Sequence, residues 1–238
     1  NEIINPLADF LYETDYNLSE ALKILLKSKH FFDLDNVQTT DNNTGALIKS
    51  PLELLLGLLR FFDVSVPDRE KDTINFYKDF SLFLEKIEYQ GLNFYEPFEV
   101  AGYPAYHQMP GFARNWITTY ALAHRYQIGD ILMKRIGDPE SSGIKLDILE
   151  WVNNSGYIND PGNAEQTVRF FTDHLFPVNI NTERFEYFLN IVFLDTLSQN
   201  TWQYEWNNYK NSGDDTVVRE RFEILLSAII QTPEFQLY

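Results

Sequence analysis

The 238-residue sequence contains no cysteine. Disulfide bonds, thiolate nucleophiles and zinc sites built on sulfur are therefore excluded, although the cellular compartment stays open because some secreted proteins also lack cysteine. Basic residues are scarce: 19 Lys and Arg stand against 35 Asp and Glu, for a formal net charge of −16. Because nucleic acids and anionic membranes are bound by clustered Lys and Arg, this balance argues against either partner.

Several common motifs are missing as well. No run of about 18 uninterrupted apolar residues occurs, so no transmembrane helix is predicted. The nucleophile elbow GxSxG, the P-loop and the dinucleotide-binding GxGxxG are all absent. The four histidines form no HxxxH pair, so we expect neither a metal site nor a cofactor. A calcium loop counted from Asp33 would need Gly and Glu where Gln38 and Thr44 stand.

Large apolar side chains are abundant. Hydrophobic residues make up 44% of the chain and aromatic residues 16%, a composition typical of a globular protein. Leucine far outnumbers valine, which favours helices because β-branched side chains lose rotamer freedom in a helix. We therefore predict an all-α fold of about eight to ten helices, forming one domain over residues 1–238 with a possible internal boundary at residues 138–143.

Two helix starts carry capping residues. Asn17 precedes an apolar pattern that runs to about residue 30, with Glu20 placed to close a capping box. Ser50 is followed by Pro51 in the first helical turn and by Glu53 at the third position, before an apolar run that ends at residue 62. This second helix is apolar on nearly all sides, so we expect it to be central.

Further helices are predicted from apolar residues spaced three and four apart. Between residues 68 and 88 this spacing predicts a helix with a buried stripe of Ile74, Tyr77, Phe80, Leu84 and Ile87. A stretch at 116–136 is predicted to form one kinked helix or two consecutive helices. The remaining helices are predicted at 146–152, 164–175, 182–197, 202–210 and 216–231.

Residues 91–113 form an unusual segment that we expect to organise the fold. The segment contains six aromatic residues but only two charged ones, and its three prolines and three glycines rule out a continuous helix. Exposed loops are seldom so apolar, so we expect this irregular segment to pack across the helix at 50–62. An irregular stretch of more than about 15 residues is either functional or a misassigned element, and the sequence leaves both open.

Within this segment the candidate ligand-binding residues are Tyr103, Tyr106, His107 and Gln108. Aromatic and polar side chains alternate there without charge, and a sugar can stack on such rings. The alternative is a structural role in which the aromatic side chains are buried anchors, namely Phe94, Phe98, Phe112 and Trp116.

Two arginines flank Trp116. Arg114 and Arg125 either bind an anion or, as is commoner beside irregular backbone, donate hydrogen bonds to its carbonyl oxygens. We expect Arg125 to point toward the backbone of residues 99–106, with Trp116 beneath that turn. At the end of the chain we expect Phe235, which follows Pro233, to be buried.

Three stretches, taken in order, carry a family resemblance: LIKSPLELLLGLLRFF (47–62), GLNFYEPFEVAGYPAYHQMPGFARNWITTYALAHR (91–125) and ILLSAIIQTPEFQLY (224–238). The matching residues are Lys49, Ser50, Pro51, Glu53, Gly91, Leu92, Phe94, Pro97, Val100, Gly102, Trp116, Ile117, Arg125, Thr232, Pro233, Glu234 and Phe235. Together they resemble the C-terminal half of the domain-of-unknown-function 1800 family of bacterial proteins. Glu96, Tyr103 and Thr232 depart from the family pattern, which has Pro, Trp and Ser at these positions.

The resemblance implies a secreted, periplasmic or envelope-associated protein of which residues 1–238 are the C-terminal part. Family members often occur beside a sulfatase-like family, which is therefore a possible partner protein, and the resemblance supplies no catalytic residues. We expect a binding or structural module for a partner protein or a surface glycan. The alternative is a hydrolase that acts on envelope polysaccharide or a sulfated glycan, which would need convergent carboxylates, or a histidine beside a carboxylate, in a cleft.

Overall fold

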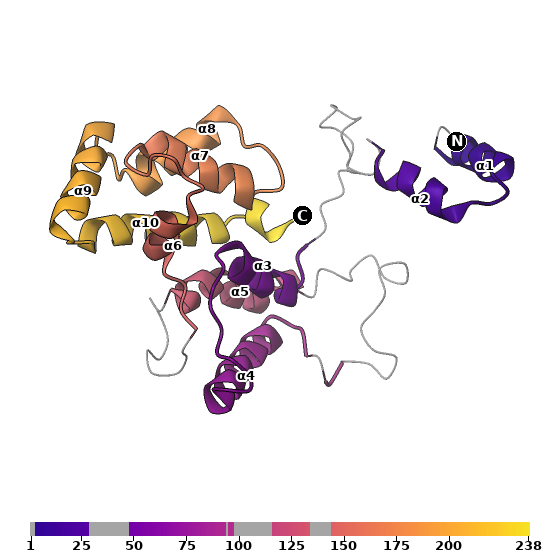
Figure 1. The fold of residues 1–238 in the computed structure, drawn as a ribbon, viewed down its shortest axis with the longest axis horizontal. Coiled ribbons are helices and arrows are strands. Elements are labelled where there is room, and N and C mark those ends of the chain that lie inside the picture. The colour runs from indigo at the N-terminus through magenta and orange to yellow at the C-terminus, as the bar shows by residue number, and fades with distance from the viewer. Residues whose placement is uncertain (1–2, 29–47, 94, 98–115, 134–143) are drawn as a thin grey trace. The chain divides into compact units, whose positions relative to one another are not determined.

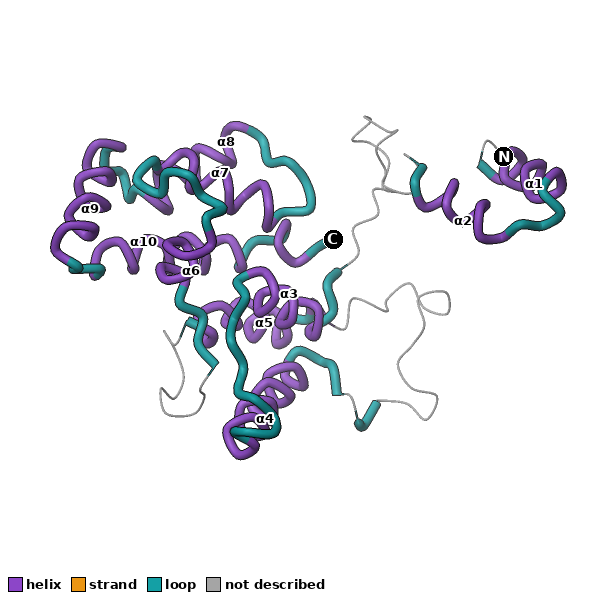
Figure 2. Tube along the Cα trace, viewed as in Figure 1, coloured by secondary structure: helices purple, strands orange, loops and turns teal. Residues whose placement is uncertain are grey.

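The computed structural model describes residues 3–28, 48–93, 95–97, 116–133 and 144–238. Within these ranges the chain forms ten α-helices and no extended strand, as Figures 1 and 2 show. The prediction of an all-α fold is therefore confirmed. The chain divides into two compact units, Asn1–Ala46 and Leu47–Tyr238. The predicted boundary at residues 138–143 lies outside the described residues.

The first unit is a pair of helices, α1 (Ile4–Glu13) and α2 (Leu18–Leu26). The helix α2 begins at the predicted cap, because the side chain of Asn17 accepts a hydrogen bond from the backbone N–H of Glu20; the Glu20 carboxylate pairs with Lys23 rather than closing the capping box. The helix α1 has no such side-chain cap, which explains why no start signal is visible in its sequence. Among the described residues of this unit only Ala21 is buried.

The larger unit begins with α3 (Pro51–Phe61), α4 (Thr73–Tyr89) and α5 (Thr119–Leu132). The predicted capping box at the start of α3 is present, with Ser50 and Glu53 each accepting a hydrogen bond from the other's backbone N–H. The leucines of α3 are mostly buried, so this helix lies in the core as expected. The helix α5 runs through Gly129 without interruption, which resolves the earlier alternative in favour of one helix.

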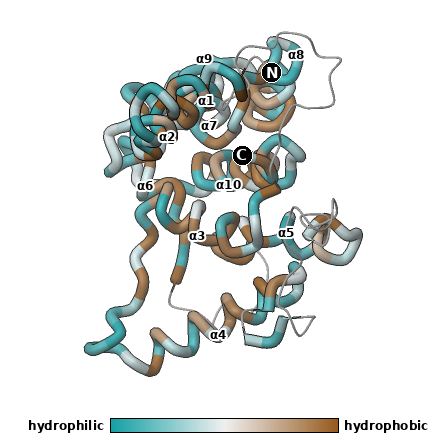
Figure 3. The backbone as a smooth tube through the Cα atoms, turned by 90° about the vertical axis from the view of Figure 1, so that its right-hand side faces the viewer, coloured by the Kyte–Doolittle hydropathy of each residue, from teal (hydrophilic) through white to brown (hydrophobic). Residues whose placement is uncertain are grey.

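The predicted buried stripe of α4 is largely wrong. Ile74 is 82% exposed, and Tyr77 and Leu84 are exposed as well. Ile87 is buried as predicted, and the buried face also carries Phe83 and Asp79, each four residues from the next, on a helix that contacts α5. Figure 3 shows apolar and polar stretches alternating along the whole of α4. Because apolar residues occupy more than one side of this helix, their spacing alone does not identify the side that faces the core.

Five further helices complete the larger unit: α6 (Ile148–Ser155), α7 (Ala164–Leu175), α8 (Thr182–Glu186), α9 (Gln199–Ser212) and α10 (Thr216–Ile230). The helix α8 continues directly into a π-helical segment, Tyr187–Phe193. The helix α10 contacts α5, α6, α7, α9 and the π-helical segment. Its fully buried side chains, among them Phe222, make it the centre of the core.

The residues after α10 fold back to the start of α3. The backbone N–H of Lys49 donates to the carbonyl oxygen of Gln236 at 2.9 Å, and Ile48 and Leu237 form an isolated antiparallel bridge. Phe235 lies in the 3₁₀ turn Glu234–Gln236 and is 4% exposed. We call residues 48–49 and 235–237, which are joined in this way, the terminal clasp.

Candidate functional site

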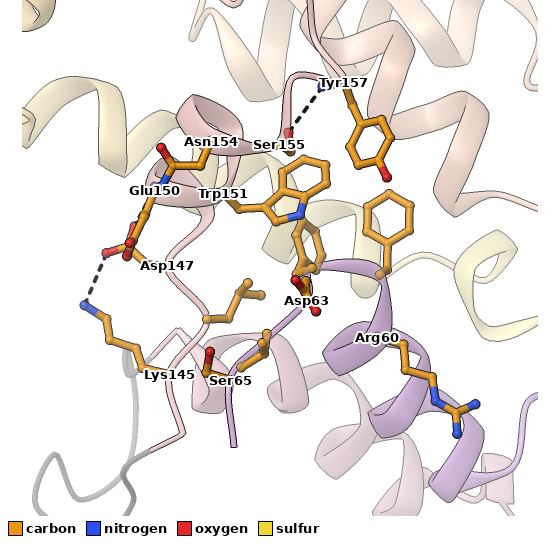
Figure 4. Close-up of a pocket in the computed structure, with 14 residues that line it drawn as sticks. Arg60, Asp63, Ser65, Lys145, Asp147, Glu150, Trp151, Asn154, Ser155 and Tyr157 are labelled. Carbon is orange, nitrogen blue, oxygen red and sulfur yellow. Dashed lines mark hydrogen bonds and ion pairs between the residues drawn. The ribbon is translucent and has the colours of Figure 1, made fainter. Parts of the chain in front are cut away.

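A pocket of about 660 Å³ lies between the end of α3 and the first turns of α6. Figure 4 shows the side chains that surround it. Its lining residues come from two stretches far apart in the sequence: Arg60, Phe61, Phe62, Asp63, Val64 and Ser65, and Lys145, Leu146, Asp147, Glu150, Trp151, Asn154, Ser155 and Tyr157. Most of these side chains are charged or polar, and three of them are carboxylates.

The end of α3 places Asp63 at the pocket. The backbone N–H of Val64 donates to the carbonyl oxygen of Leu59 at 2.8 Å, and that of Asp63 donates to Arg60 at 3.3 Å. This pattern closes a helix with a left-handed residue, and Asp63 has a φ of 46°. Glycine or asparagine is usual at such a position, because a left-handed residue with a side chain costs about 1 kcal/mol or more. Aspartate is tolerated at such a position, although glycine or asparagine would be more stable.

The start of α6 supplies the opposite side of the pocket. Asp147 caps this helix, because its side chain accepts a hydrogen bond from the backbone N–H of Glu150 at 3.0 Å. Glu150 and Asn154 are four residues apart and therefore lie on the same face of the helix. Gly156, with a φ of 69°, ends α6 in the left-handed region and turns the chain toward Tyr157.

The three carboxylates of the pocket differ in their partners. Asp147 accepts a hydrogen bond from Arg219 at 2.8 Å and lies 3.8 Å from the ammonium nitrogen of Lys145. Burial acts to raise the pKa of Asp147, but the hydrogen bonds from Arg219 and Glu150 and the two nearby positive charges lower it overall. By contrast, the side chains of Asp63 and Glu150 form no hydrogen bond or ion pair within the described part of the chain.

Aromatic rings form one wall of the pocket. The ring of Trp151 stacks on Phe61 with centroids 5.6 Å apart and on Tyr157 at 5.9 Å. Trp151 is only 9% exposed, and its indole N–H has no hydrogen-bond partner among the described residues. Tyr157 is 68% exposed, while its ring also stacks on Phe170 at 6.2 Å. The pocket therefore combines a free donor, two free carboxylates and a fixed, accessible ring.

The sequence did not point to this pocket. The candidate ligand-binding residues Tyr103, Tyr106, His107 and Gln108 lie outside the described residues, as do the motif residues Phe94, Gly102 and Arg114. A helix cap at Asp147 followed by Trp151 was the available local signal, but it carries no information about the end of α3, some 85 residues earlier in the chain.

Three of the motif residues that the structure describes, Lys49, Arg125 and Phe235, meet at the terminal clasp. Arg125 is fully buried in α5; its Nε donates to the side-chain oxygen of Gln236 at 2.7 Å, and its Nη2 to the carbonyl oxygen of Lys49 at 2.8 Å. Its predicted contact with residues 99–106, and the predicted position of Trp116 beneath them, fall outside the described residues. Trp116 itself is buried, whereas Pro97 is exposed.

Lys49 is the second cation of the clasp. Its ammonium nitrogen donates to the carbonyl oxygen of Phe235 at 2.7 Å and lies 4.3 Å from the centre of the Phe235 ring. Burial, together with the positive charge of Arg125, lowers the pKa of Lys49 to about 8. These contacts connect α5, the start of α3 and the end of the chain, so the motif residues here have a structural role.

Metal-binding clusters and membrane-spanning helices are both absent from the described residues. No group of three or more His, Asp or Glu side chains is placed to hold a metal ion within the described ranges. In the same ranges, none of the helices has the length and apolar character needed to cross a membrane.

The fold and the pocket together define an all-α domain with a solvent-open, polar, aromatic-walled site. A family model described as "Protein of unknown function (DUF1800)" matches residues 1–237, and the chain belongs to this family. The resemblance in the three motifs is thus confirmed, and the match extends over nearly the whole chain. No curated protein and no solved structure matches the chain.

Proposed function

We propose that this domain binds a glycan in the pocket between the end of α3 and α6. The observation that carries the proposal is the exposed ring of Tyr157 beside unpaired carboxylates and the indole N–H of Trp151. Sugars present apolar C–H faces that stack on aromatic rings and hydroxyl groups that need donors and acceptors. The volume of about 660 Å³ lies within the usual range for small-molecule sites and suits one or two sugar rings.

The charges of the pocket indicate which glycans it accepts. Asp63 and Glu150 would face any bound ligand without a neutralising partner among the described residues. A sulfated glycan is negatively charged, so these carboxylates and the net charge of −16 would repel it. The proposal is therefore a neutral or cationic glycan. A surface glycan agrees with the envelope location that the family resemblance implies, and that location is part of the proposal.

A hydrolase is the second candidate, because three carboxylates line the same pocket. Asp147 is unsuited to be the general acid, since its pKa is lowered and its oxygens are occupied by Arg219 and the helix cap. A catalytic pair would therefore consist of Asp63 and Glu150. Incubation with envelope polysaccharide tests this: new reducing ends that disappear in the Glu150→Gln variant would support hydrolysis, and their absence would leave binding alone.

Binding is tested with a glycan array, followed by calorimetric titration of the oligosaccharides that bind. Tyr157→Ala should weaken binding by about ten-fold or more, because ring stacking contributes on the order of 1 to 2 kcal/mol. Tyr204→Ala is the matched control, since Tyr204 in α9 is 67% exposed and does not line the pocket. Equal affinity of the Tyr157 and Tyr204 variants would contradict the proposal.

A second variant compares this pocket with the site expected from the sequence. The triple alanine substitution of Tyr103, Tyr106 and His107 should leave binding intact if the pocket at α6 holds the glycan. Loss of binding in this variant, with a helical circular dichroism spectrum and an unaffected Tyr157→Ala protein, would move the glycan site to residues 103–107.

A further inference from the structure

We propose that the pocket selects glycans that carry a protonated primary amine, such as amino sugars without an acetyl group. This inference rests on the proposed function, since it names the class of sugar that the same pocket takes. It follows from the charges that remain unpaired in the pocket and from where they lie relative to the aromatic wall.

Two of the pocket's carboxylates are available for a cationic ligand. The charge of Asp147 is balanced by Arg219 at 2.8 Å and by Lys145 at 3.8 Å. Asp63 and Glu150 have no such partner among the described residues. In Figure 4 the guanidinium of Arg60 points away from Glu150 and Asp147. Among the lining residues three carboxylates stand against two cations, Arg60 and Lys145, so the pocket keeps an excess of negative charge.

Figure 4 shows how these charges lie relative to the aromatic wall. In the view of Figure 4, Trp151 lies between Glu150 on one side and Tyr157 on the other, with Asp63 below its indole ring. A sugar ring stacked on Tyr157 would direct its substituents toward the carboxylates. An ammonium group donates up to three hydrogen bonds, and bonds between an ammonium and a carboxylate are roughly twice as strong as those between neutral groups.

The indole N–H of Trp151 adds a requirement that the amine alone does not meet. The Trp151 side chain is 9% exposed and lines the pocket, and its indole N–H forms no hydrogen bond with the described residues. A sugar hydroxyl can accept its hydrogen bond, whereas an ammonium group cannot. A polyhydroxy amine can therefore pair with all three groups.

The experiment compares three β-1,4-linked tetrasaccharides that differ only at carbon 2: glucosamine, N-acetylglucosamine and glucose. We expect the glucosamine tetramer to bind about ten-fold or more tightly than the other two near pH 6 and at low salt. Its advantage should shrink at high salt, because salt screens exposed charges. Asp63→Asn and Glu150→Gln should each remove most of the advantage, whereas Glu183→Gln, which changes an exposed carboxylate of α8 outside the pocket, should keep it.

The outcomes separate this inference from the proposed function. Equal binding of all three tetrasaccharides would overturn the amine selectivity but leave glycan binding in place. No binding of any oligosaccharide on the array would overturn both. If tetralysine competed for the pocket as effectively as the glucosamine tetramer, the pocket would recognise positive charge alone. That result would overturn the assignment of a sugar ligand. Thermal unfolding of each variant shows whether a loss of binding reflects a loss of fold.

Discussion

The buried contact between Arg125 and Gln236 should be strongly coupled energetically. The two residues are 111 positions apart in the chain, and the Arg125 Nε donates to the Gln236 side-chain oxygen at 2.7 Å. Both side chains are almost completely buried. Arg125→Met would therefore leave the Gln236 side-chain oxygen and the Lys49 carbonyl oxygen without their donor.

The expected size of the effect follows from these two lost hydrogen bonds. An unsatisfied buried acceptor costs about 1 to 3 kcal/mol, and removing the guanidinium also removes the cost of keeping it out of water. We expect Arg125→Met to lower the free energy of unfolding by about 3 to 5 kcal/mol. Arg60→Met, which changes an exposed arginine, should alter it by less than about 0.5 kcal/mol.

A double-mutant cycle measures the coupling directly. Gln236→Met also breaks the contact, and additionally removes the hydrogen bond from its amide to the carbonyl oxygen of Ile230. The double variant should lose less stability than the two single variants summed, by about 1.5 to 3 kcal/mol, as for hydrogen bonds to charged groups. Urea unfolding followed by circular dichroism gives the four free energies. Additivity within about 0.5 kcal/mol would show that the two side chains do not interact and would refute the reasoning.

Three further predictions concern single residues. Phe235→Ala should destabilise the protein by about 3 to 5 kcal/mol, since the ring is 4% exposed; an unchanged melting temperature would instead show a free C-terminal tail. The pKa of Lys49 is about 8 in the folded state and 10.5 ordinarily. Between these two pH values the unfolded state binds more protons than the folded state, so the free energy of unfolding should increase as the pH rises. Lys49→Met should remove this rise, and identical pH profiles of the two proteins would contradict the assignment. Asp63→Asn should raise the free energy of unfolding by about 0.5 to 1 kcal/mol, because asparagine suits a left-handed helix end and the change removes a negative charge there. A lower melting temperature for that variant would show that Asp63 is stabilising.

Much of the fold could be predicted because the chain marks its helices locally. The residues Ser50, Pro51 and Glu53 correctly predict the start of α3, and the predicted helix at 164–175 coincides with α7. The exceptions have physical causes. The helix α1 lacks a capping side chain, and the predicted helix at 182–197 changes to π-helical geometry at Tyr187, which no local propensity signals.

The pocket could not be predicted in the same way, because it depends on tertiary packing. Asp63 is notable only once its left-handed conformation is known, and Glu150 is one of 35 acidic residues in the sequence. What distinguishes these two carboxylates is that they line the same pocket, where the third, Asp147, is paired with Arg219, which is 72 residues away. Such pairings become visible only when distant helices have been placed in space.

The terminal clasp has a consequence for how the larger unit folds. Lys49 and Phe235 are 186 residues apart, so forming their contact closes nearly the whole unit into a loop, at an entropic cost of about 5 kcal/mol. The local helices and the packing around α10 can form before this loop closes. Contacts of the clasp should therefore be absent from the folding transition state, with φ-values near zero. Substitutions there would accelerate unfolding and leave the refolding rate almost unchanged, so that the clasp determines the lifetime of the native state.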